Sequence, residues 1–89
     1  MEEYINKIRK EAQKNDQIFW DIPKNDINSL SPEALIERFL NYGNMRQFRK
    51  ISKDKASFRK IYSNIRNKNR SNLSPLVINY VDLYLKKNA

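Results

Sequence analysis

The strongest constraint on the fold is a helix-start signal that occurs twice, at Leu30-Ser31-Pro32 and at Leu73-Ser74-Pro75. In each copy the serine side chain can accept a hydrogen bond from a free backbone N–H group, and the proline has no N–H to leave unpaired. The leucines stand at the position before the cap, where they can pack against Leu35 and Ile78 as hydrophobic staples. Two helices are therefore expected to begin at residues 32 and 75.

Apolar spacing extends the helical prediction to most of the chain. The sequence has a single glycine, Gly43, and no strand-like alternation of any length. Gly43 is expected to end one helix in the left-handed conformation. Asn44, with Gln47 three residues later, has the pattern of a capping box, and Asp54 is a plausible cap for the next helix. Five helices are predicted, over about residues 2–15, 32–42, 45–53, 55–66 and 75–87.

These elements predict one domain over residues 1–89, of the all-α class, folded as a compact bundle of about five short helices. The first helix, within residues 1–15, has a narrow apolar stripe, so weak packing and the greatest mobility are expected there. Residues 16–30 read as a connector, from which Phe19 and Trp20 are expected to fill the core as buried side chains. Residues 31–87 form the predicted helical core.

Composition excludes several kinds of chemistry. The chain has no cysteine and no histidine, which removes disulfides, thiolate metal sites and the commonest general base. Glu33 and Glu37 lie one turn apart, but nothing apolar surrounds them, and Glu33 is explained as a partner of the helix dipole. No enzyme activity, metal or cofactor is expected. The charged N-terminus and the short apolar runs predict a cytoplasmic protein that does not enter the membrane.

Positive charge is concentrated in one third of the chain. The formal net charge is +8, and residues 44–72 hold ten Lys or Arg but only one acid, Asp54. Such asymmetry indicates a surface that meets nucleic acid or an acidic protein. At 100° per residue the cations fall on helix faces opposite or beside the apolar stripes. The candidate binding residues are Arg46, Arg49, Lys50, Lys53, Lys55, Arg59, Arg66, Lys68 and Arg70.

Three interpretations of this basic segment stay open. The cations could neutralise phosphates of DNA or RNA, they could meet an acidic protein, or they could simply be solvated. The third and fourth helices could also form a helix-turn-helix-like unit in which Arg59, Ser63 and Asn67 reach base edges. The turn between these helices lacks the glycine typical of that motif, which counts against it.

The C-terminal helix is apolar nearly all round. Leu76 and Leu83 form one apolar patch, and a second, broad face carries Val77, Ile78, Tyr80, Val81, Tyr84 and Leu85. Such a helix is either central to the core, the interpretation we favour, or half of an interface. In the second case Leu76 and Leu83 would stay exposed in one chain and be covered in a homodimer. A protein-interaction module of this kind, without nucleic-acid binding, is the alternative function.

Three motifs resemble a family of short bacterial proteins. They are Phe19-Trp20-Asp21, the run from Leu35 to Gly43 containing Glu37-Arg38 and Tyr42-Gly43, and Leu73-Ser74-Pro75 followed by Asn79 and Leu83. The family pattern is FWD … ERxLxYG … LSxxTxN, and the likeness covers about residues 18–85. Val77 and Ile78 stand where the family has its threonine region, and residues 52–57 lack a glycine-containing turn. Members are often encoded beside abortive-infection-type nucleotidyltransferase toxins. The resemblance implies an antitoxin-like or toxin-associated role.

Overall fold

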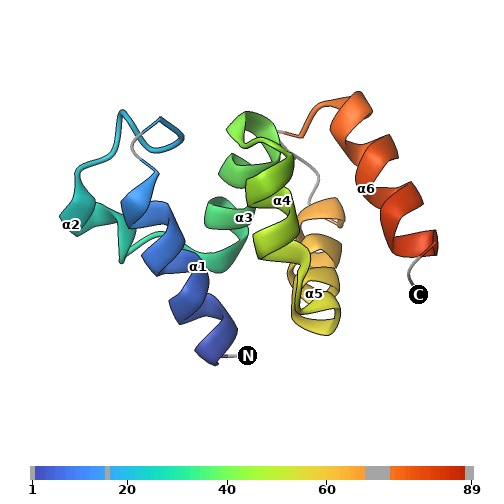
Figure 1. The fold of residues 1–89 in the computed structure, drawn as a ribbon, viewed down its shortest axis with the longest axis horizontal. Coiled ribbons are helices and arrows are strands. Elements are labelled where there is room, and N and C mark those ends of the chain that lie inside the picture. Colours follow the sequence, from blue (N-terminus) through green and yellow to red (C-terminus); the bar gives the residue numbers. More distant parts are fainter. Residues whose placement is uncertain (1, 16, 68–72, 88–89) are drawn as a thin grey trace.

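The computed structural model describes residues 2–15, 17–67 and 73–87. These residues form six helices and no strand, which confirms the all-α prediction (Figure 1). The helices are α1 (Glu2–Lys14), α2 (Lys24–Ile27), α3 (Pro32–Tyr42), α4 (Met45–Ser52), α5 (Lys55–Arg66) and α6 (Pro75–Lys87). Helix α2 lies within the predicted connector and was not expected from the sequence. A single turn that buries only Ile27 is too short to show a periodic apolar stripe.

The predicted caps begin the helices where they were expected. Ser31 Oγ accepts a hydrogen bond from the Ala34 N–H at 3.1 Å, and Ser74 Oγ accepts one from the Val77 N–H at 3.3 Å. Asn44 and Gln47 form a reciprocal capping box, each side chain accepting from the other residue's N–H, at 3.0 and 2.7 Å. Asp54 accepts from the Ser57 N–H at 3.2 Å. Side chains thus satisfy N–H groups that have no partner within their own helix.

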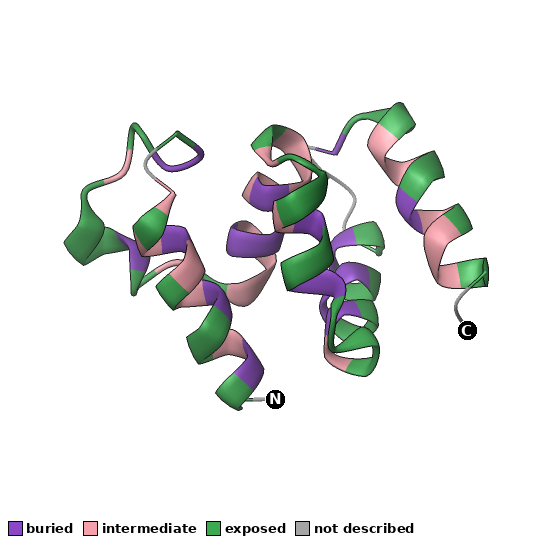
Figure 2. Ribbon diagram, in the orientation of Figure 1, coloured by how far each residue is buried: buried purple, intermediate pink, exposed green. Residues whose placement is uncertain are grey.

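The core gathers around α3, which packs against α1, α4 and α5. Leu35 and Ile36 of α3 are fully buried, and Phe39 is 2 % exposed. Helix α1 lies along one side of this centre, and the Tyr4 hydroxyl donates to the carbonyl oxygen of Ile51 in α4. In Figure 2 the buried segments of α1, α3, α4 and α5 lie toward the middle of the molecule. The narrow stripe of α1 is therefore enough to bury three side chains, which are Tyr4, Ile8 and Ala12.

The expected burial of Trp20 is wrong. Phe19 is buried edge-on against Phe39, with ring centroids 5.4 Å apart, whereas Trp20 is 77 % exposed. The Arg38 guanidinium explains the difference, because it donates to both carboxylate oxygens of Asp21 at 2.7 Å and to the Ile18 carbonyl at 3.0 Å. These bonds fix the turn with Ile18 and Phe19 inward and leave Trp20 facing solvent.

The apolar periodicity of α3 and α4 also predicts that Tyr42 and Met45 face inward, and both lie outside. Tyr42 is 64 % exposed and Met45 is 51 % exposed. Tyr42 packs on the surface, where the Arg38 guanidinium lies 6.0 Å from the centroid of its ring. Met45 lies at the rim of a groove that faces α6, where the Tyr80 hydroxyl bonds to its sulfur at 3.3 Å.

Gly43 ends α3, but not in the left-handed conformation. Its φ is −82° and its ψ is 166°, which is extended backbone. The glycine is needed for space instead, because its N–H donates to the Phe39 carbonyl at 2.9 Å and a Cβ would lie 2.4 Å from that same oxygen. A Cβ essentially never comes this close to a backbone oxygen, so any side chain here must displace the end of α3 or the turn.

We expect Gly43→Ala to lower the free energy of unfolding by about 1–3 kcal/mol, the usual range for a side chain forced into occupied space. Urea denaturation followed by circular dichroism measures the change. Ala56→Ser, at an exposed position in the first turn of α5, is the control and should stay within about 0.5 kcal/mol of the parent. Equal stability of Gly43→Ala and the parent would contradict the close approach.

The Asp21–Arg38 pair predicts an acid-sensitive contribution to stability. The hydrogen bonds from Arg38 hold the pKa of Asp21 below its usual range. A carboxyl with a lowered folded-state pKa contributes stability above its unfolded pKa, near 4, and that stability is lost as pH falls through the lowered value. Asp21→Asn should therefore lower the melting temperature at pH 7 and flatten its decline below about pH 4. A difference in melting temperature between the two proteins that stays constant from pH 7 down to pH 2 would contradict this.

Candidate functional site

Helix α4 presents four cations on one face and its core residues on the other. Its buried side chains are Phe48, Ile51 and Ser52. Lys50 forms an ion pair with Glu11 of α1 at 2.9 Å, and its ammonium lowers the pKa of that carboxyl. The other three cations form no ion pair with any residue that the structure describes. We call the exposed set the cationic face of α4; its members are Arg46, Arg49, Lys50 and Lys53.

A lysine of α1 joins this face. A hollow of about 290 Å³ opens between α1 and the α4–α5 turn, and its lining includes Lys7, Lys50, Lys53 and Asp54. Lys7 was not among the predicted binding residues, because it lies almost forty residues before the basic segment. The periodicity of Tyr4 and Ile8 placed a helix there, but only the three-dimensional packing shows that this helix lies beside α4.

The second predicted row of cations, on α5, has a different environment. Arg59 Nη2 donates to the Leu85 carbonyl of α6 at 3.0 Å, and Arg66 forms an ion pair with Asp82 at 3.2 Å. The Tyr62 hydroxyl also donates to Asp82, at 2.7 Å; burial and this bond raise the pKa of Tyr62. Leu85 lies in the last turn of α6, where carbonyl groups have no partner within the helix. Arg59 and Arg66 are therefore exposed but engaged, and they hold α6 against α5.

The predicted site residues thus fall into two groups. Those on α4 face solvent, and those on α5 lie beside α6, with Lys55 exposed at the start of α5. Lys68 and Arg70 lie outside the described residues. Arg59, Ser63 and Asn67, expected to reach base edges in a helix-turn-helix-like unit, line a hollow of about 370 Å³ whose other wall includes Asp82 and Leu85 of α6. Helix α6 therefore stands next to the face that a recognition helix would insert into a DNA groove.

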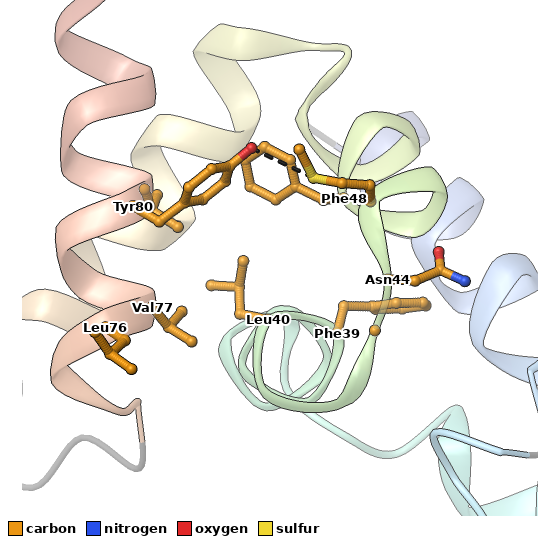
Figure 3. Close-up of a pocket in the computed structure, with 10 residues that line it drawn as sticks. Phe39, Leu40, Asn44, Phe48, Leu76, Val77 and Tyr80 are labelled. Carbon is orange, nitrogen blue, oxygen red and sulfur yellow. Dashed lines mark hydrogen bonds between the residues drawn. The ribbon is translucent and has the colours of Figure 1, made fainter.

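Helix α6 is peripheral, not central to the core as we favoured. Val81 is its one buried residue, and Figure 1 shows the helix at one edge of the molecule. Leu76 is 81 % exposed and Leu83 is 59 % exposed, as expected for an interface helix seen in a single chain. Between α6 and the end of α3 lies a groove of about 300 Å³ with apolar walls (Figure 3).

Among the described residues, no three Asp or Glu side chains come together in a way that could hold a metal ion. Glu33, weighed in the sequence as one of a carboxylate pair, accepts a hydrogen bond from Asn64 of α5 at 3.4 Å. Among the described helices, none is long and apolar enough to span a bilayer.

Comparison with protein-family models, curated proteins and solved structures gives no match to this chain. The resemblance to the family of short bacterial proteins therefore stays a prediction. Two of its motifs meet in space, since Asp21 of the first motif pairs with Arg38 of the second.

The contacts that Arg59 and Arg66 make with α6 should contribute to its local stability. Arg66→Ala removes the ion pair with Asp82, so α6 should open more often while the α3 core is unchanged. Amide hydrogen exchange in α6 should then speed up by roughly 2- to 5-fold, as expected for loss of a partly exposed ion pair. Lys60→Ala changes an exposed α5 lysine that forms no ion pair with the described residues, and it should leave exchange in α6 unchanged. Equal exchange in both variants would show that Arg66 does not hold α6.

Proposed function

We propose that this protein is a non-enzymatic binding protein that contacts the phosphate backbone of DNA or RNA through the cationic face of α4. The observation that carries the proposal is that three of the four cations on this face lack a carboxylate partner among the described residues. Arg46, Arg49 and Lys53 are exposed and have no carboxylate partner in the described chain. Like charges this close on one helix repel one another, and no carboxylate of the described residues neutralises these three. They are therefore available to attract a polyanion.

The dimensions of the face suit a sugar–phosphate strand. Arg46 and Lys53 are seven residues apart, which corresponds to about 10 Å along a helix. Successive phosphates of one DNA strand rise about 3.4 Å along the duplex axis, so the face spans about three such rises and can meet about four phosphates. Lys7 of α1 lines the hollow beside Lys50 and Lys53 and so extends the charged area. Contacts of this kind fix position and supply affinity without reading sequence.

We further propose a regulatory role for this binding, which the family resemblance supports. If the chain is antitoxin-like, a toxin-like nucleotidyltransferase would be its protein partner, and the cytoplasm would be its location. An acidic protein could meet the same cations in place of nucleic acid. The two kinds of partner differ in how steeply their affinity falls with salt, because only a phosphate backbone releases a condensed counterion for each contact.

The test measures binding of random-sequence duplex and single-stranded oligonucleotides by anisotropy from about 50 to 200 mM salt. About four phosphate contacts predict a slope of log affinity against log salt of roughly −4 on duplex DNA. Arg49→Glu with Lys53→Glu should reduce affinity about 100-fold near 0.1 M salt, since each lost contact removes roughly tenfold, and should bring the slope to about −2.

The matched control is Lys24→Glu with Lys60→Glu. Both lysines are exposed and lie on α2 and α5, outside the cationic face, and the pair changes the net charge by the same amount. This control should bind within about threefold of the parent, because distant charges are screened beyond roughly 10 Å. Equal loss in both double variants would show a non-specific effect of net charge. Absence of binding to either oligonucleotide at micromolar protein would reject nucleic acid and favour an acidic protein partner.

A further inference from the structure

The hollow between α1 and the α4–α5 turn brings together cations from separate parts of the chain. Lys7 comes from α1, Lys50 comes from α4, and Lys53 is the residue at which α4 ends. The volume is about 290 Å³, near the lower limit of pockets that bind small molecules. We call this space the lysine hollow; its lining is Tyr4, Lys7, Ile8, Lys50, Lys53 and Asp54.

Two of the three lysines are available to a ligand. Lys50 already forms an ion pair with Glu11, at 2.9 Å. Lys7 and Lys53 are exposed, and neither forms an ion pair with a residue that the structure describes. The lysine hollow therefore offers two positive charges that no carboxylate of the described chain neutralises by direct contact.

Asp54, the acid in the lining, is engaged elsewhere. Its two carboxylate oxygens accept hydrogen bonds from the Ser57 N–H at 3.2 Å and from the Ser57 hydroxyl at 2.9 Å. The carboxylate thus faces the first turn of α5, where the helix dipole is positive. The bonds from Ser57 hold the pKa of Asp54 below its usual range, and the Lys7 ammonium lowers this pKa further. That effect is expected of a lysine that points from α1 towards the turn.

A phosphate monoester matches the two available charges. Near pH 7 a monoester carries a charge of about −1.5 to −2 and has three strong acceptor oxygens. An internal phosphate of a nucleic-acid strand is a diester and carries a single negative charge. Two ammonium groups that line one small concave space can donate to different oxygens of the same compact dianion. The charge and the size of the lysine hollow therefore favour a monoester over a diester.

The position of the lysine hollow favours the end of a strand. Lys50 and Lys53 belong both to the cationic face of α4 and to the hollow, so a strand that follows this face reaches the hollow. Helix α1 lies beside α4 (Figure 1), joined to it by the Lys50–Glu11 pair and by the Tyr4 hydroxyl bond. It bounds the hollow on the side away from α4. A terminal phosphate can enter such a space, whereas an internal phosphate has chain on both sides.

We propose that the lysine hollow binds the phosphate monoester at the end of a nucleic-acid strand, with Lys7 and Lys53 donating to its oxygens. This inference rests on the proposed function and adds a preference for phosphorylated ends. A small phosphate monoester has the same chemistry at the phosphate. It lacks the contacts that a strand makes with Arg46 and Arg49, so it should bind more weakly than the strand.

The experiment compares single strands of about twelve nucleotides that differ in one terminal group. One set carries a 5′-phosphate, a 5′-methyl phosphate or a 5′-hydroxyl, with the fluorescent label at the 3′ end; a second set has the opposite arrangement. Anisotropy near 0.1 M salt should show, in at least one set, that the monoester binds roughly tenfold more tightly than the hydroxyl. The methyl ester has lost one charge, so it should bind at least about threefold more weakly than the monoester.

Lys7→Gln is the test variant and Lys10→Gln is its matched control. Both replace an exposed lysine of α1 and remove the same charge, but only Lys7 lines the hollow. In Lys7→Gln the ratio of monoester affinity to hydroxyl affinity should fall at least about threefold, since one of two donors is lost. Lys10→Gln should keep the ratio of the parent. The methyl resonances of Ile8, another lining residue, should shift with the monoester strand and not with the hydroxyl strand.

Three results would overturn the inference. They are equal binding of monoester and hydroxyl strands in both sets, an equal change of the ratio in the two variants, and a nucleoside monophosphate that binds as tightly as the phosphorylated strand. The last result would assign the hollow to a free phosphate compound. If hydroxyl strands bind with the expected salt dependence and the terminal phosphate has no effect, only this inference fails. If no strand binds at all, the proposed function fails as well.

Discussion

The packing of the Phe48 ring is the interaction on which the arrangement of α4, α5 and α6 depends. It lies edge-on to Phe58 of α5 at 5.8 Å and to Tyr80 and Tyr84 of α6 at 5.3 and 5.0 Å, measured between ring centroids. Edge-to-face pairs of this kind contribute about 0.5–1.5 kcal/mol each beyond the area they bury. One side chain of α4 thus joins the helix that carries the free cations to the helix that walls the apolar groove.

Helix α4 needs this contact because it could not persist alone. It has eight residues, whereas isolated helices shorter than about 12–15 residues are marginal in water. Its cations lie three and four residues apart, where like charges repel. The capping box at Asn44 and the burial of Phe48 and Ile51 offset this repulsion. The same packing holds the four charges at fixed spacing, so a polyanion would meet them without first ordering the backbone.

Local signals made the helices predictable. What was missed depends on contacts between residues that lie far apart in the sequence. The caps Ser31, Asn44 and Asp54 act within three residues, so the sequence alone located the helix starts to within one position. Periodicity identified the inner face of each helix, but it could not show which helices oppose one another. The exposure of Trp20 depends on Arg38, seventeen residues away from Asp21 in the chain, and no periodic pattern records that bond.

The two rows of cations show the same limit at the candidate site. On helical wheels the rows of α4 and α5 look alike, and the sequence grouped them together. In the fold, the α5 row lies beside the C-terminal turns of α6, where an unpaired carbonyl and Asp82 attract Arg59 and Arg66. No comparable acceptor faces Arg49 or Lys53 among the described residues. The neighbouring helix therefore distinguishes a structural cation from one that is free to bind a partner. Here that helix is α6, which supplies the acceptors for Arg59 and Arg66.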